Sequence, residues 1–480
     1  MRFPVSRLLL LVVLLFLFAS SGYAQSEFLY LNRDYYPDQN AVSALSIAAD
    51  GSLAEIAGSP FPTSGQGIRG GGRQGVVING LFLFASNTCS SNVSAFTINP
   101  TTGALRLVQG SPFSTRGGSG CVSDGMSLAI TPSGKFLMAG NTGDGTISVF
   151  NVLPSGQLTL VPGSPFQTAG EPLDMKVTND NNFLVVASGM FGGIEVYRIS
   201  SSGVLTAVSG SPFLRDRNRA PAALDMRCDG KIFVEGSIDF GKVIDVLNIS
   251  ETGQLSPIAG SPVIISYTGP CLGRLTFDER FLFANRIGFE PVFVFSVAPD
   301  GRPVLVPDAG ANLVTDYNLS VITNHNSDNA YFGTFGVDFL IRTRIDPNGI
   351  LIPVNNVPLT GSFGGVPSLA VFPAKVCGPA FNFCIQDESN GGVLKINNTI
   401  GSYQFTNCRG VTISGIGSIL ARGCSLTLQV NGPDRRVLAK IDTCAKTASA
   451  SIQVLSSSTT FTLLDRNTAN NTCLCASSSR

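Results

Sequence analysis

Residues 107–113 read LVQGSPF, and four near-copies of this stretch occur elsewhere in the chain. The copies are EIAGSPF (55–61), LVPGSPF (160–166), AVSGSPF (207–213) and PIAGSPV (257–263). Each is a short apolar run that ends at Gly-Ser-Pro. Proline has no N–H to give to a neighbouring strand, so pairing should stop there. The Phe that follows in four copies is then expected to fold back as an apolar anchor between neighbouring sheets.

A second glycine stands in a polar turn seven residues before each motif glycine, and the turn recurs twice more where the motif itself has decayed. Glycine suits such turns because it accepts positive φ without a Cβ clash. The turn therefore marks seven units of about 50 residues, the sign of a repeat architecture. The turn glycines are Gly51, Gly103, Gly156, Gly203, Gly253, Gly301 and Gly349.

One unit, residues 126–166, can be divided into four strands separated by Gly-bearing turns. Its strands A to D are SLAI, KFLMAG, TISVFNV and QLTLV. Period-two alternation and the turn residues support this division. Four antiparallel strands per unit, repeated radially seven times, predict an all-β chain that forms a seven-bladed β-propeller.

The sequence also predicts how the ring closes. Residues 27–32, EFLYLN, match a B strand, yet no A strand precedes them. The missing strand is found at 367–373, PSLAVFP, which resembles MSLAITP of the complete unit. We therefore expect the propeller to span 25–375 and the two segments to pair, leaving no open sheet edge at the joint.

The first residues resemble an export signal. Arg2 and Arg7 precede an apolar run from Leu8 to Phe18, and small residues allow cleavage after Ala24. An N-terminal anchor is the alternative, although the run is short for a membrane span and no later stretch is long enough. Residues 1–24 are thus predicted to be a signal peptide and the protein to be secreted or periplasmic. Lys+Arg and Asp+Glu balance at 32 each, which gives no electrostatic reason to expect nucleic acid.

Export places the 11 cysteines in an oxidising compartment, where disulfides persist. Cys89 and Cys121 fall in loops on the same face of adjacent units and are candidates for a disulfide. Cys228 and Cys271 are expected on opposite faces and are not paired. Seven cysteines lie in 376–480, whose short alternating runs predict a small disulfide-containing β-sandwich-like domain. Irregular spacing and a single His argue against zinc, so no metal or other cofactor is predicted.

The G-x-L-x-x-V-x-GSPF and SG-K-F-L-x-x-x-N elements resemble those of the seven-bladed propeller lactonase family, which includes 6-phosphogluconolactonase-like proteins. The resemblance spans roughly 26–375 and is more specific for the fold than for activity. In that family, His, Arg and Glu residues around the channel mouth are associated with hydrolysis. The only His here, His325, is predicted in an A–B turn on the opposite face, as a solvated side chain.

A ligand would meet a propeller of this kind where the D–A and B–C loops surround the channel. The charged residues predicted at that rim are Arg73, Glu171, Arg219, Glu235 and Arg274. Their excess of arginine suggests an anionic ligand, and solvated loop charges are the alternative. No catalytic residue is assigned.

Two functions remain open from the sequence. The first is an extracytoplasmic binding or scaffold protein, for a protein partner or for a small molecule such as an anion or a sugar acid. The alternative is a lactone hydrolase acting on a sugar-acid lactone, which predicts clustered Arg and Glu at the channel.

Overall fold

The computed structural model describes most of the chain from Ser26 to Cys377 and the backbone of eight later strands. The described ranges are 26–33, 39–68, 74–118, 121, 125–214, 220–236, 243–264, 272–285, 292–310, 318–334, 338–360, 367–375, 377 and the later strands up to Leu464. The chain divides into two units, Ser26–Pro379 and Ala380–Arg480 with the first 25 residues, and each is considered by itself. The expected signal peptide lies outside the described residues.

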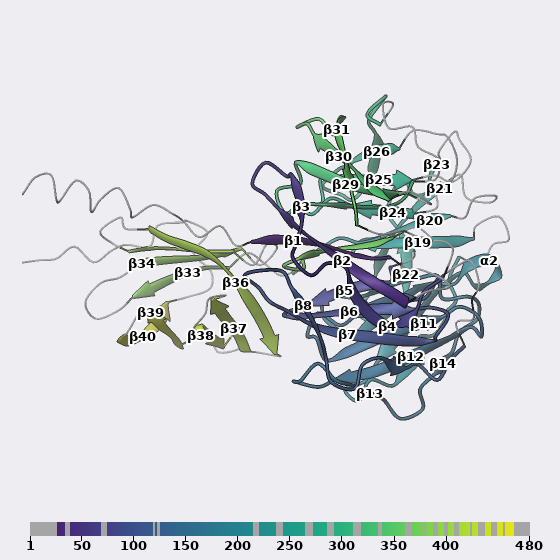
Figure 1. Ribbon diagram of the computed structural model, residues 1–480, viewed down its shortest axis with the longest axis horizontal. Coiled ribbons are helices and arrows are strands. Elements are labelled where there is room, and N and C mark those ends of the chain that lie inside the picture. Colours follow the sequence, from purple (N-terminus) through teal and green to yellow (C-terminus); the bar gives the residue numbers. More distant parts are fainter. Residues whose placement is uncertain are drawn as a thin grey trace, which may run out of the picture. The chain divides into compact units, whose positions relative to one another are not determined.

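Ser26–Pro379 contains seven antiparallel sheets of four or five strands, which are the seven predicted blades (Figure 1). Blade 1 has β32 (Ser368–Phe372), β1 (Glu27–Asn32), β2 (Gln39–Ile47), β3 (Leu53–Glu55) and β4 (Phe61–Gln66). Blade 2 has β5 (Val76–Asn79), β6 (Phe82–Asn87), β7 (Asn92–Ile98), β8 (Leu105–Leu107) and β9 (Phe113–Ser114). Blade 3 has β10 (Ser127–Ile130), β11 (Phe136–Asn141), β12 (Thr146–Val152), β13 (Leu158–Leu160) and β14 (Phe166–Gln167).

The remaining blades follow the same order from strand A outward. Blade 4 has β15 (Asp174–Val177), β16 (Phe183–Ala187), the short helix α2 (Gly189–Gly192), β17 (Ile194–Ile199) and β18 (Leu205–Ala207). Blade 5 has β19 (Pro221–Met226), β20 (Ile232–Gly236), β21 (Val243–Ile249), β22 (Leu255–Pro257) and β23 (Val263–Ile264). Blade 6 has β24 (Leu272–Leu275), β25 (Phe281–Asn285), β26 (Phe293–Val297) and β27 (Pro303–Leu305). Blade 7 has β28 (Asn318–Thr323), β29 (Asn329–Thr334), β30 (Phe339–Ile345) and β31 (Leu351–Pro358).

Blade 1 joins the two ends of the propeller. β1 pairs antiparallel with β32, from Phe28 opposite Phe372 to Asn32 opposite Ser368. These are the two segments that the repeat pattern brings together. On the other side of the joint, the buried Tyr331 hydroxyl of blade 7 donates a 2.8 Å hydrogen bond to the carbonyl of Gly51 in blade 1. The ring is therefore sealed both within a sheet and between sheets.

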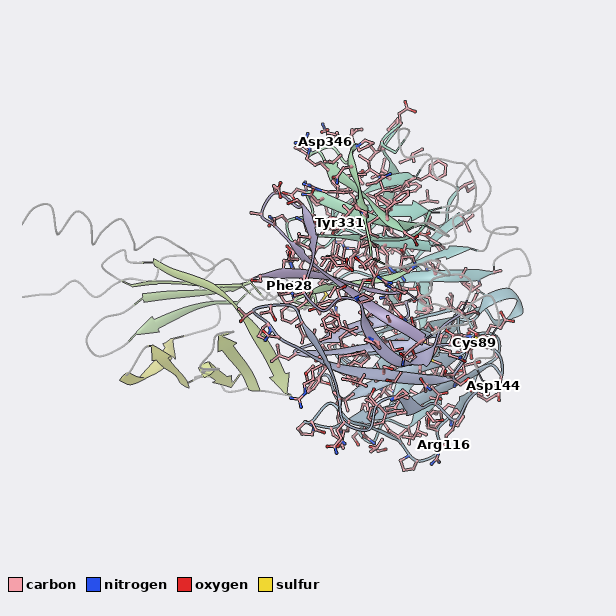
Figure 2. The ribbon with its side chains drawn as sticks, in the orientation of Figure 1. Phe28, Cys89, Arg116, Asp144, Tyr331 and Asp346 are labelled. Atoms are coloured by element: carbon pink, nitrogen blue, oxygen red, sulfur yellow. A yellow bond between two sulfur atoms is a disulfide. The ribbon has the colours of Figure 1, made fainter. Side chains whose placement is uncertain are left out.

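The turn glycines also hold neighbouring blades together. Gly103 of blade 2 has a φ of +71°, and a Cβ there would come within 2.5 Å of the Phe28 ring of blade 1. A side chain is thus excluded both by backbone conformation and by lack of space. In Figure 2, Asp346 lies at the upper edge of the propeller and Arg116 at the lower edge, with Phe28 and Tyr331 between them. The same contact recurs as Gly156 on Phe82, Gly203 on Phe136, Gly253 on Phe183 and Gly349 on Phe281.

The Gly-Ser-Pro motif shapes the outer edge of five blades. In blade 2, Ser111 Oγ accepts a 2.9 Å hydrogen bond from the backbone N–H of Ala95 in β7. The cis Ser-Pro peptide follows. Pairing then resumes, because Phe113 lies opposite Val93 of the same strand; the proline therefore interrupts the outer strand and does not end it. The serines of the other four copies accept the equivalent bond at 2.9–3.1 Å.

The motif phenylalanines behave as expected, because they pack at the seams between blades. Phe113 packs against a buried cluster that joins Val93 of blade 2 to Leu128 of blade 3. Phe61 packs likewise between blades 1 and 2. The apolar core of the propeller is thus a series of inter-blade clusters, which fixes the inner strands around a common centre.

Ala380–Arg480 forms an eight-stranded antiparallel sheet in the order β38-β37-β36-β35-β34-β33-β40-β39. Its strands are β33 (Phe381–Gln386), β34 (Gly392–Asn397), β35 (Ser402–Asn407), β36 (Thr412–Arg422), β37 (Ser425–Val430), β38 (Val437–Asp442), β39 (Ser449–Val454) and β40 (Ser457–Leu464). The sequence predicts an all-β module of about seven strands. The structure has eight strands in one connected sheet, and its two end strands, β38 and β39, contact each other.

Candidate functional site

A cavity of about 300 Å³ lies at the centre of the ring and is lined by strand A of every blade. A pocket of this size is at the lower end of the range that binds small molecules. Phe277 of the A–B turn of blade 6 and Thr323, the last residue of β28, line one end of it. The cavity is therefore the central channel, reached in part from the A–B-turn face.

At one equivalent position of strand A, the side chain is charged in some blades and apolar in others. In each blade, one residue at the start of strand B contacts the turn glycine of the next blade, as Phe136 contacts Gly203. The position meant is the strand A residue that pairs two residues after that contact, for example Ala129 opposite Met138. In three consecutive blades, 4 to 6, it is charged, whereas it is apolar in the other four. In order from blade 1 the residues are Ala370, Val77, Ala129, Lys176, Asp225, Arg274 and Ile322.

Asp225 is the only carboxylate among the described residues that line this cavity. Lys176 Nζ lies 3.1 Å from its Oδ1, and the backbone N–H of Leu275 donates to its Oδ2 at 2.9 Å. Burial by itself would raise the pKa of Asp225, but Lys176 and Arg274 outweigh it and hold that pKa below its usual value. Asp225 is therefore an ionised group in the wall of the cavity.

Arg274 connects blades 4, 5 and 6. Its Nη1 donates to Asp174 Oδ2 at 3.0 Å, to the Leu224 carbonyl at 3.3 Å and to the Gly273 carbonyl at 2.8 Å. Burial by itself would lower the pKa of Arg274, but the carboxylates of Asp174 and Asp225 outweigh burial and raise that pKa above its usual value. The guanidinium is thus fixed in place, charged, and part of the cavity wall.

Glu235 is a buried acid beside this cluster. Its side chain is 1% exposed, and neither carboxyl oxygen has a hydrogen-bond partner among the described residues. A Cβ on Gly273 of the next blade would lie 1.5 Å from Glu235 Oε1, so only glycine leaves room for the carboxyl group. Burial, partly opposed by Arg274, raises the pKa of Glu235 to about 8. The Glu235 carboxyl group is therefore mostly protonated at pH 7.

The structure brings together two of the five predicted rim residues, Glu235 and Arg274. Glu171 is exposed, just before β15. Arg73 and Arg219 lie outside the described residues. Sequence reasoning missed Asp174, Lys176 and Asp225, although aligning the A strands by their turns would have shown charged residues where other repeats carry Ser, Ala or Val.

Two disulfides are present in the described residues. Cys89 and Cys121 are bonded, as their predicted positions on adjacent blades suggest. Cys228 is bonded to Cys377, whose Cα lies 4.9 Å away. Cys377 was expected to belong to the C-terminal module, but β32 returns the chain to the A–B-turn face where Cys228 lies. Cys271 is outside the described residues.

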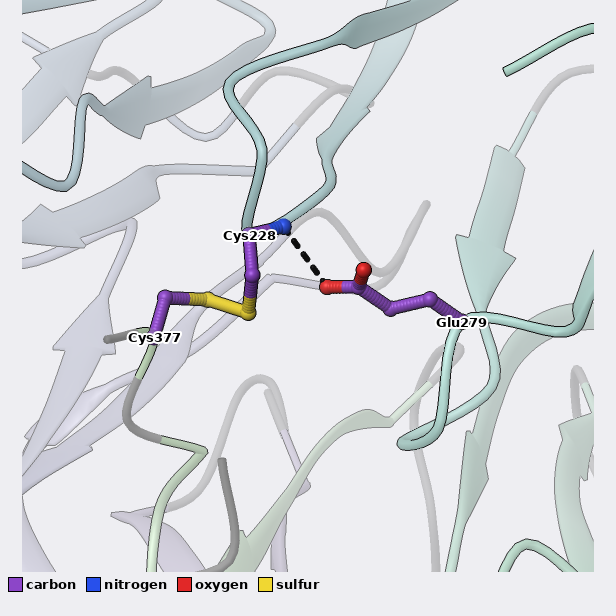
Figure 3. A group of neighbouring side chains, drawn as sticks. All are labelled: Cys228, Glu279 and Cys377. Atoms are coloured by element: carbon purple, nitrogen blue, oxygen red, sulfur yellow. Dashed lines mark hydrogen bonds between the residues drawn. A yellow bond between two sulfur atoms is a disulfide. The ribbon is translucent and has the colours of Figure 1, made fainter. Parts of the chain in front are cut away.

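Glu279 lies next to the second disulfide and accepts a 2.7 Å hydrogen bond from the backbone N–H of Cys228 (Figure 3). Two cysteines and a carboxylate at this spacing resemble a metal-ligand set. The two sulfurs are bonded to each other, however, and thiolates are the form that binds metal. The cluster is therefore a structural cross-link with an acidic neighbour.

His325 is in the predicted A–B turn, but the expectation of a solvated side chain is wrong. Its side chain is 15% exposed, and its Nδ1 lies 2.8 Å from Glu27 Oε1. Its Nε2 lies 2.7 Å from the Pro373 carbonyl, and its ring contacts Phe277 edge-on at 4.3 Å. Because both ring nitrogens are engaged, His325 serves as a link between blade 7 and the two segments that close the ring.

A second hollow, of about 570 Å³, lies at the outer edge of blades 2 and 3. Its lining consists of the repeated motif, including Pro112 and Phe113, with Leu158–Ser164. Arg116 is its only charged residue among those described. No group of catalytic side chains converges there, so the central cavity is the better candidate site.

Comparison with known proteins supports the family resemblance. Residues 71–214, which cover blades 2 to 4, match the family described as Lactonase, 7-bladed beta-propeller. A putative 6-phosphogluconolactonase from Bacteroides fragilis has 18% identity and a TM-score of 0.56, with 73% of this chain and 99% of that chain covered. The periplasmic gluconolactonase PpgL from Pseudomonas aeruginosa has 16% identity and a TM-score of 0.59, with 72% and 99% covered.

At these identities the solved structures show the fold alone. No curated protein matches the chain in sequence. Within the described residues, no helix combines the length and apolar character needed to cross a membrane. The family match over residues 71–214 confirms the predicted resemblance to the seven-bladed propeller lactonase family, and the seven sheets confirm the seven-bladed architecture.

Proposed function

We propose that this lactonase-like propeller hydrolyses a lactone, of the sugar-acid class, in its central cavity. The observation that carries the proposal is the arc of Lys176, Asp225 and Arg274 on three consecutive blades. The other strand residues that line the cavity are apolar or neutral. Such a local break in a repeated scaffold is where function is expected, because the fold itself needs no charge there. A cluster of Arg and acidic residues is also what the hydrolase alternative predicts from the sequence.

The reaction needs a nucleophilic water and stabilisation of a negatively charged oxygen. Water adds to the ester carbonyl, the ring C–O bond breaks, and the departing ring oxygen takes up a proton, giving a hydroxy acid. Asp225, ionised, is suited to orient the water and accept its proton. Arg274 and Lys176 are suited to stabilise charge on the carbonyl oxygen, which is commonly the largest contribution in acyl transfer.

Neutral Glu235 matters for the charge balance of this site. If it were ionised, it would add another negative charge beside Arg274 and weaken the field available to the substrate. As a buried neutral acid it leaves Arg274 paired with Asp174 and still acting on the cavity. A loss of activity as the pH rises through about 8 is the corresponding expectation.

An extracytoplasmic location is part of the proposal. Two disulfides in the propeller fit an oxidising compartment, and one structural neighbour is described as periplasmic. The apolar N-terminal segment is consistent with export.

A binding protein without catalysis is the second candidate. It is favoured by the pairing of the charges, since Lys176 is bonded to Asp225 and Arg274 to Asp174. The engagement of His325 away from the cavity, in an inter-blade link, points the same way. Such a protein would hold a small polar molecule or a protein partner and release it unchanged.

The deciding experiment is hydrolysis of glucono-δ-lactone and other sugar lactones by the purified protein, followed as acid release. We expect turnover that falls about 100-fold or more in Asp225→Asn. Asp300→Asn, at an exposed acid in the turn between β26 and β27 of blade 6, is the matched control and should keep full activity. Saturable binding of the lactones without acid release would support the binding protein, and turnover unaffected by Asp225→Asn would contradict the proposed site.

A further inference from the structure

The chain after β32 crosses three blades within a few residues. We call Pro373, Ala374, Lys375 and Cys377 the strap. It leaves blade 1 on the A–B-turn face and is attached in turn to blades 7, 6 and 5. The attachments are the Pro373 carbonyl to His325 Nε2 at 2.7 Å, Lys375 Nζ to Glu279 Oε1 at 2.8 Å, and the disulfide from Cys377 to Cys228.

The strap lies at the end of the central cavity. Ala374 and Lys375 are part of the cavity lining, together with Phe277 of an A–B turn and Thr323 at the end of β28. The Lys375 ammonium also faces the Phe277 ring, 5.8 Å from its centre. This short segment thus forms part of the wall at the turn-side end, where other blades contribute only their turns.

Lys375 brings a third positive charge to the arc of Lys176 and Arg274. All three cations lower the pKa of the same carboxyl group, Asp225, so their fields overlap in the cavity. The Lys375 ammonium has three donors, and Glu279 takes one of them. Its side chain is 23% exposed, so the remaining donors are not fully enclosed by protein.

We propose that the strap is the floor of the ligand cavity and that Lys375 is a ligand-binding residue that selects for anionic groups, with the Cys228–Cys377 disulfide holding it in position. The inference rests on the proposed function only in placing a ligand in the channel. The inference adds the class of ligand. We expect a small polar molecule that carries a carboxylate or phosphate at the end facing the strap.

The test uses a reporter thiol in the cavity and needs no knowledge of the substrate. Ala129→Cys places a thiol on the wall of blade 3. The full-length variant is treated with methanethiosulfonate reagents of similar size, one anionic and one cationic, and modification is followed peptide by peptide by mass spectrometry. The comparison is made with Lys375→Gln, with the double variant Cys228→Ser and Cys377→Ser, and with the controls below.

Lys231→Gln is the matched lysine control, because Lys231 lies on an A–B turn of blade 5 and is paired with Asp229 at 2.8 Å but does not line the cavity. Loss of the Cys89–Cys121 disulfide, by substitution of both residues with Ser, is the matched disulfide control. Neither control should alter the reporter rates.

We expect the anionic reagent to be favoured in the parent, and Lys375→Gln to reduce that preference about five-fold, the effect of one nearby charge in a mostly aqueous setting. Loss of the strap disulfide should raise both rates, because the turn-side end opens. An unchanged preference in Lys375→Gln would overturn the inference. If the disulfide variant does not fold, the two lysine variants decide alone.

The outcomes separate this inference from the proposed function. If no lactone is hydrolysed but the reagent preference depends on Lys375, the strap inference stands and the hydrolase proposal fails. If lactones are hydrolysed but Lys375→Gln changes neither the reagent preference nor the KM ratio of phosphorylated to unphosphorylated sugar lactones, the strap inference fails.

Discussion

The contacts between neighbouring blades differ between blades 1 and 2, where the buried polar side chains are neutral amides, and blades 4 to 6, where they are charged or acidic. At the seam of blades 1 and 2, Asn32 Nδ2 donates to the carbonyls of Gly75 and Ser86 at 3.1 and 2.9 Å. Asn40 continues this neutral network to Asn87. At the seams of blades 4 to 6, the buried positions instead hold Asp174, Glu235 and Arg274.

Strand B makes the contrast sharp, because Asn32 in blade 1 and Glu235 in blade 5 are equivalent by register. Each lies four residues after the strand B residue that contacts the turn glycine of the next blade, which is Phe28 on Gly103 in blade 1 and Lys231 on Gly301 in blade 5. The amide of Asn32 satisfies backbone carbonyls and serves stability. The carboxyl group of Glu235 has no described partner, so its burial is a cost of folding that only a functional site would be expected to retain.

The largest expected effect is that of removing Arg274, whose guanidinium connects blades 4, 5 and 6. Arg274→Ala leaves the buried carboxylate of Asp174 without its arginine partner, and should reduce the free energy of unfolding by about 3–5 kcal/mol. Hydrolysis should fall about 100-fold or more, as when one oxyanion donor is lost. Both are measured by denaturant unfolding and lactone turnover.

Arg280→Ala is the control for this variant, since Arg280 is also on blade 6 and is paired with an acid, Asp278, but is half exposed. It should change stability by no more than about 1 kcal/mol. Equal effects of the two arginine variants would show that the charged seams are no more demanding than the surface.

The second prediction concerns the pH dependence of stability. In the unfolded chain Glu235 ionises near pH 4.5, whereas in the folded protein it keeps its proton up to about 8. Between these values unfolding releases a proton, so the favourable contribution present below pH 4.5 is lost as the pH rises to about 8. Glu235→Gln removes this dependence and should be more stable than the parent above pH 8 by on the order of 4 kcal/mol.

Urea unfolding of both proteins at several pH values measures this difference. The two stability curves should converge at acid pH. Parallel curves across the whole window would mean that Glu235 is not a buried neutral acid, and the contrast with Asn32 would lose its basis.

The third prediction exchanges the chemistry of the two seams. Asn32→Asp replaces a donor by an acceptor facing the carbonyls of Gly75 and Ser86, so the free energy of unfolding should fall by about 2–3 kcal/mol at neutral pH. Part of that loss should be recovered in acid, where the new carboxyl group can donate. An Asn32→Asp variant as stable as the parent would show that the contact between blades 1 and 2 tolerates a buried charge as well as the contacts between blades 4 to 6 do.

The smallest expected effect tests what the blades share. Ser111→Ala removes the acceptor for the Ala95 N–H and should cost about 1 kcal/mol by thermal or urea unfolding. Ser164→Ala in blade 3 should cost a similar amount, because Ser164 makes the same bond to Val149. Ser155→Ala, an exposed turn residue, is the control. A difference between blades 2 and 3 would show that the repeat is not energetically uniform.

The repeat made most of the architecture predictable. A glycine at positive φ and a proline without an N–H act locally, so their recurrence in LVQGSPF and its copies marks turns and strand interruptions whatever surrounds them. Likewise, the likeness of 367–373 to the first strand of other units indicates the β1–β32 pairing, since each unit needs four strands. The resumption of pairing at Phe113 was not visible, because it depends on the path of the chain after the proline.

The candidate site was predictable only in part. Glu235 and Arg274 were found as charges near strand ends, but Lys176 and Asp225 sit within short A strands and look like ordinary alternating polar residues. The Cys228–Cys377 disulfide joins residues 149 apart. That pairing follows from the return of β32 to the turn face and cannot be read from spacing.

The sequence by itself determined the number of blades, their strand order and the segments that join the ring, because these follow from short-range turn chemistry repeated seven times. Only the tertiary structure decided which charges meet. Closing the ring places one residue from each of several blades, about 50 positions apart in the chain, around a single cavity. Burial and the field of the neighbouring blades then set their protonation, and neither can be obtained from any one repeat.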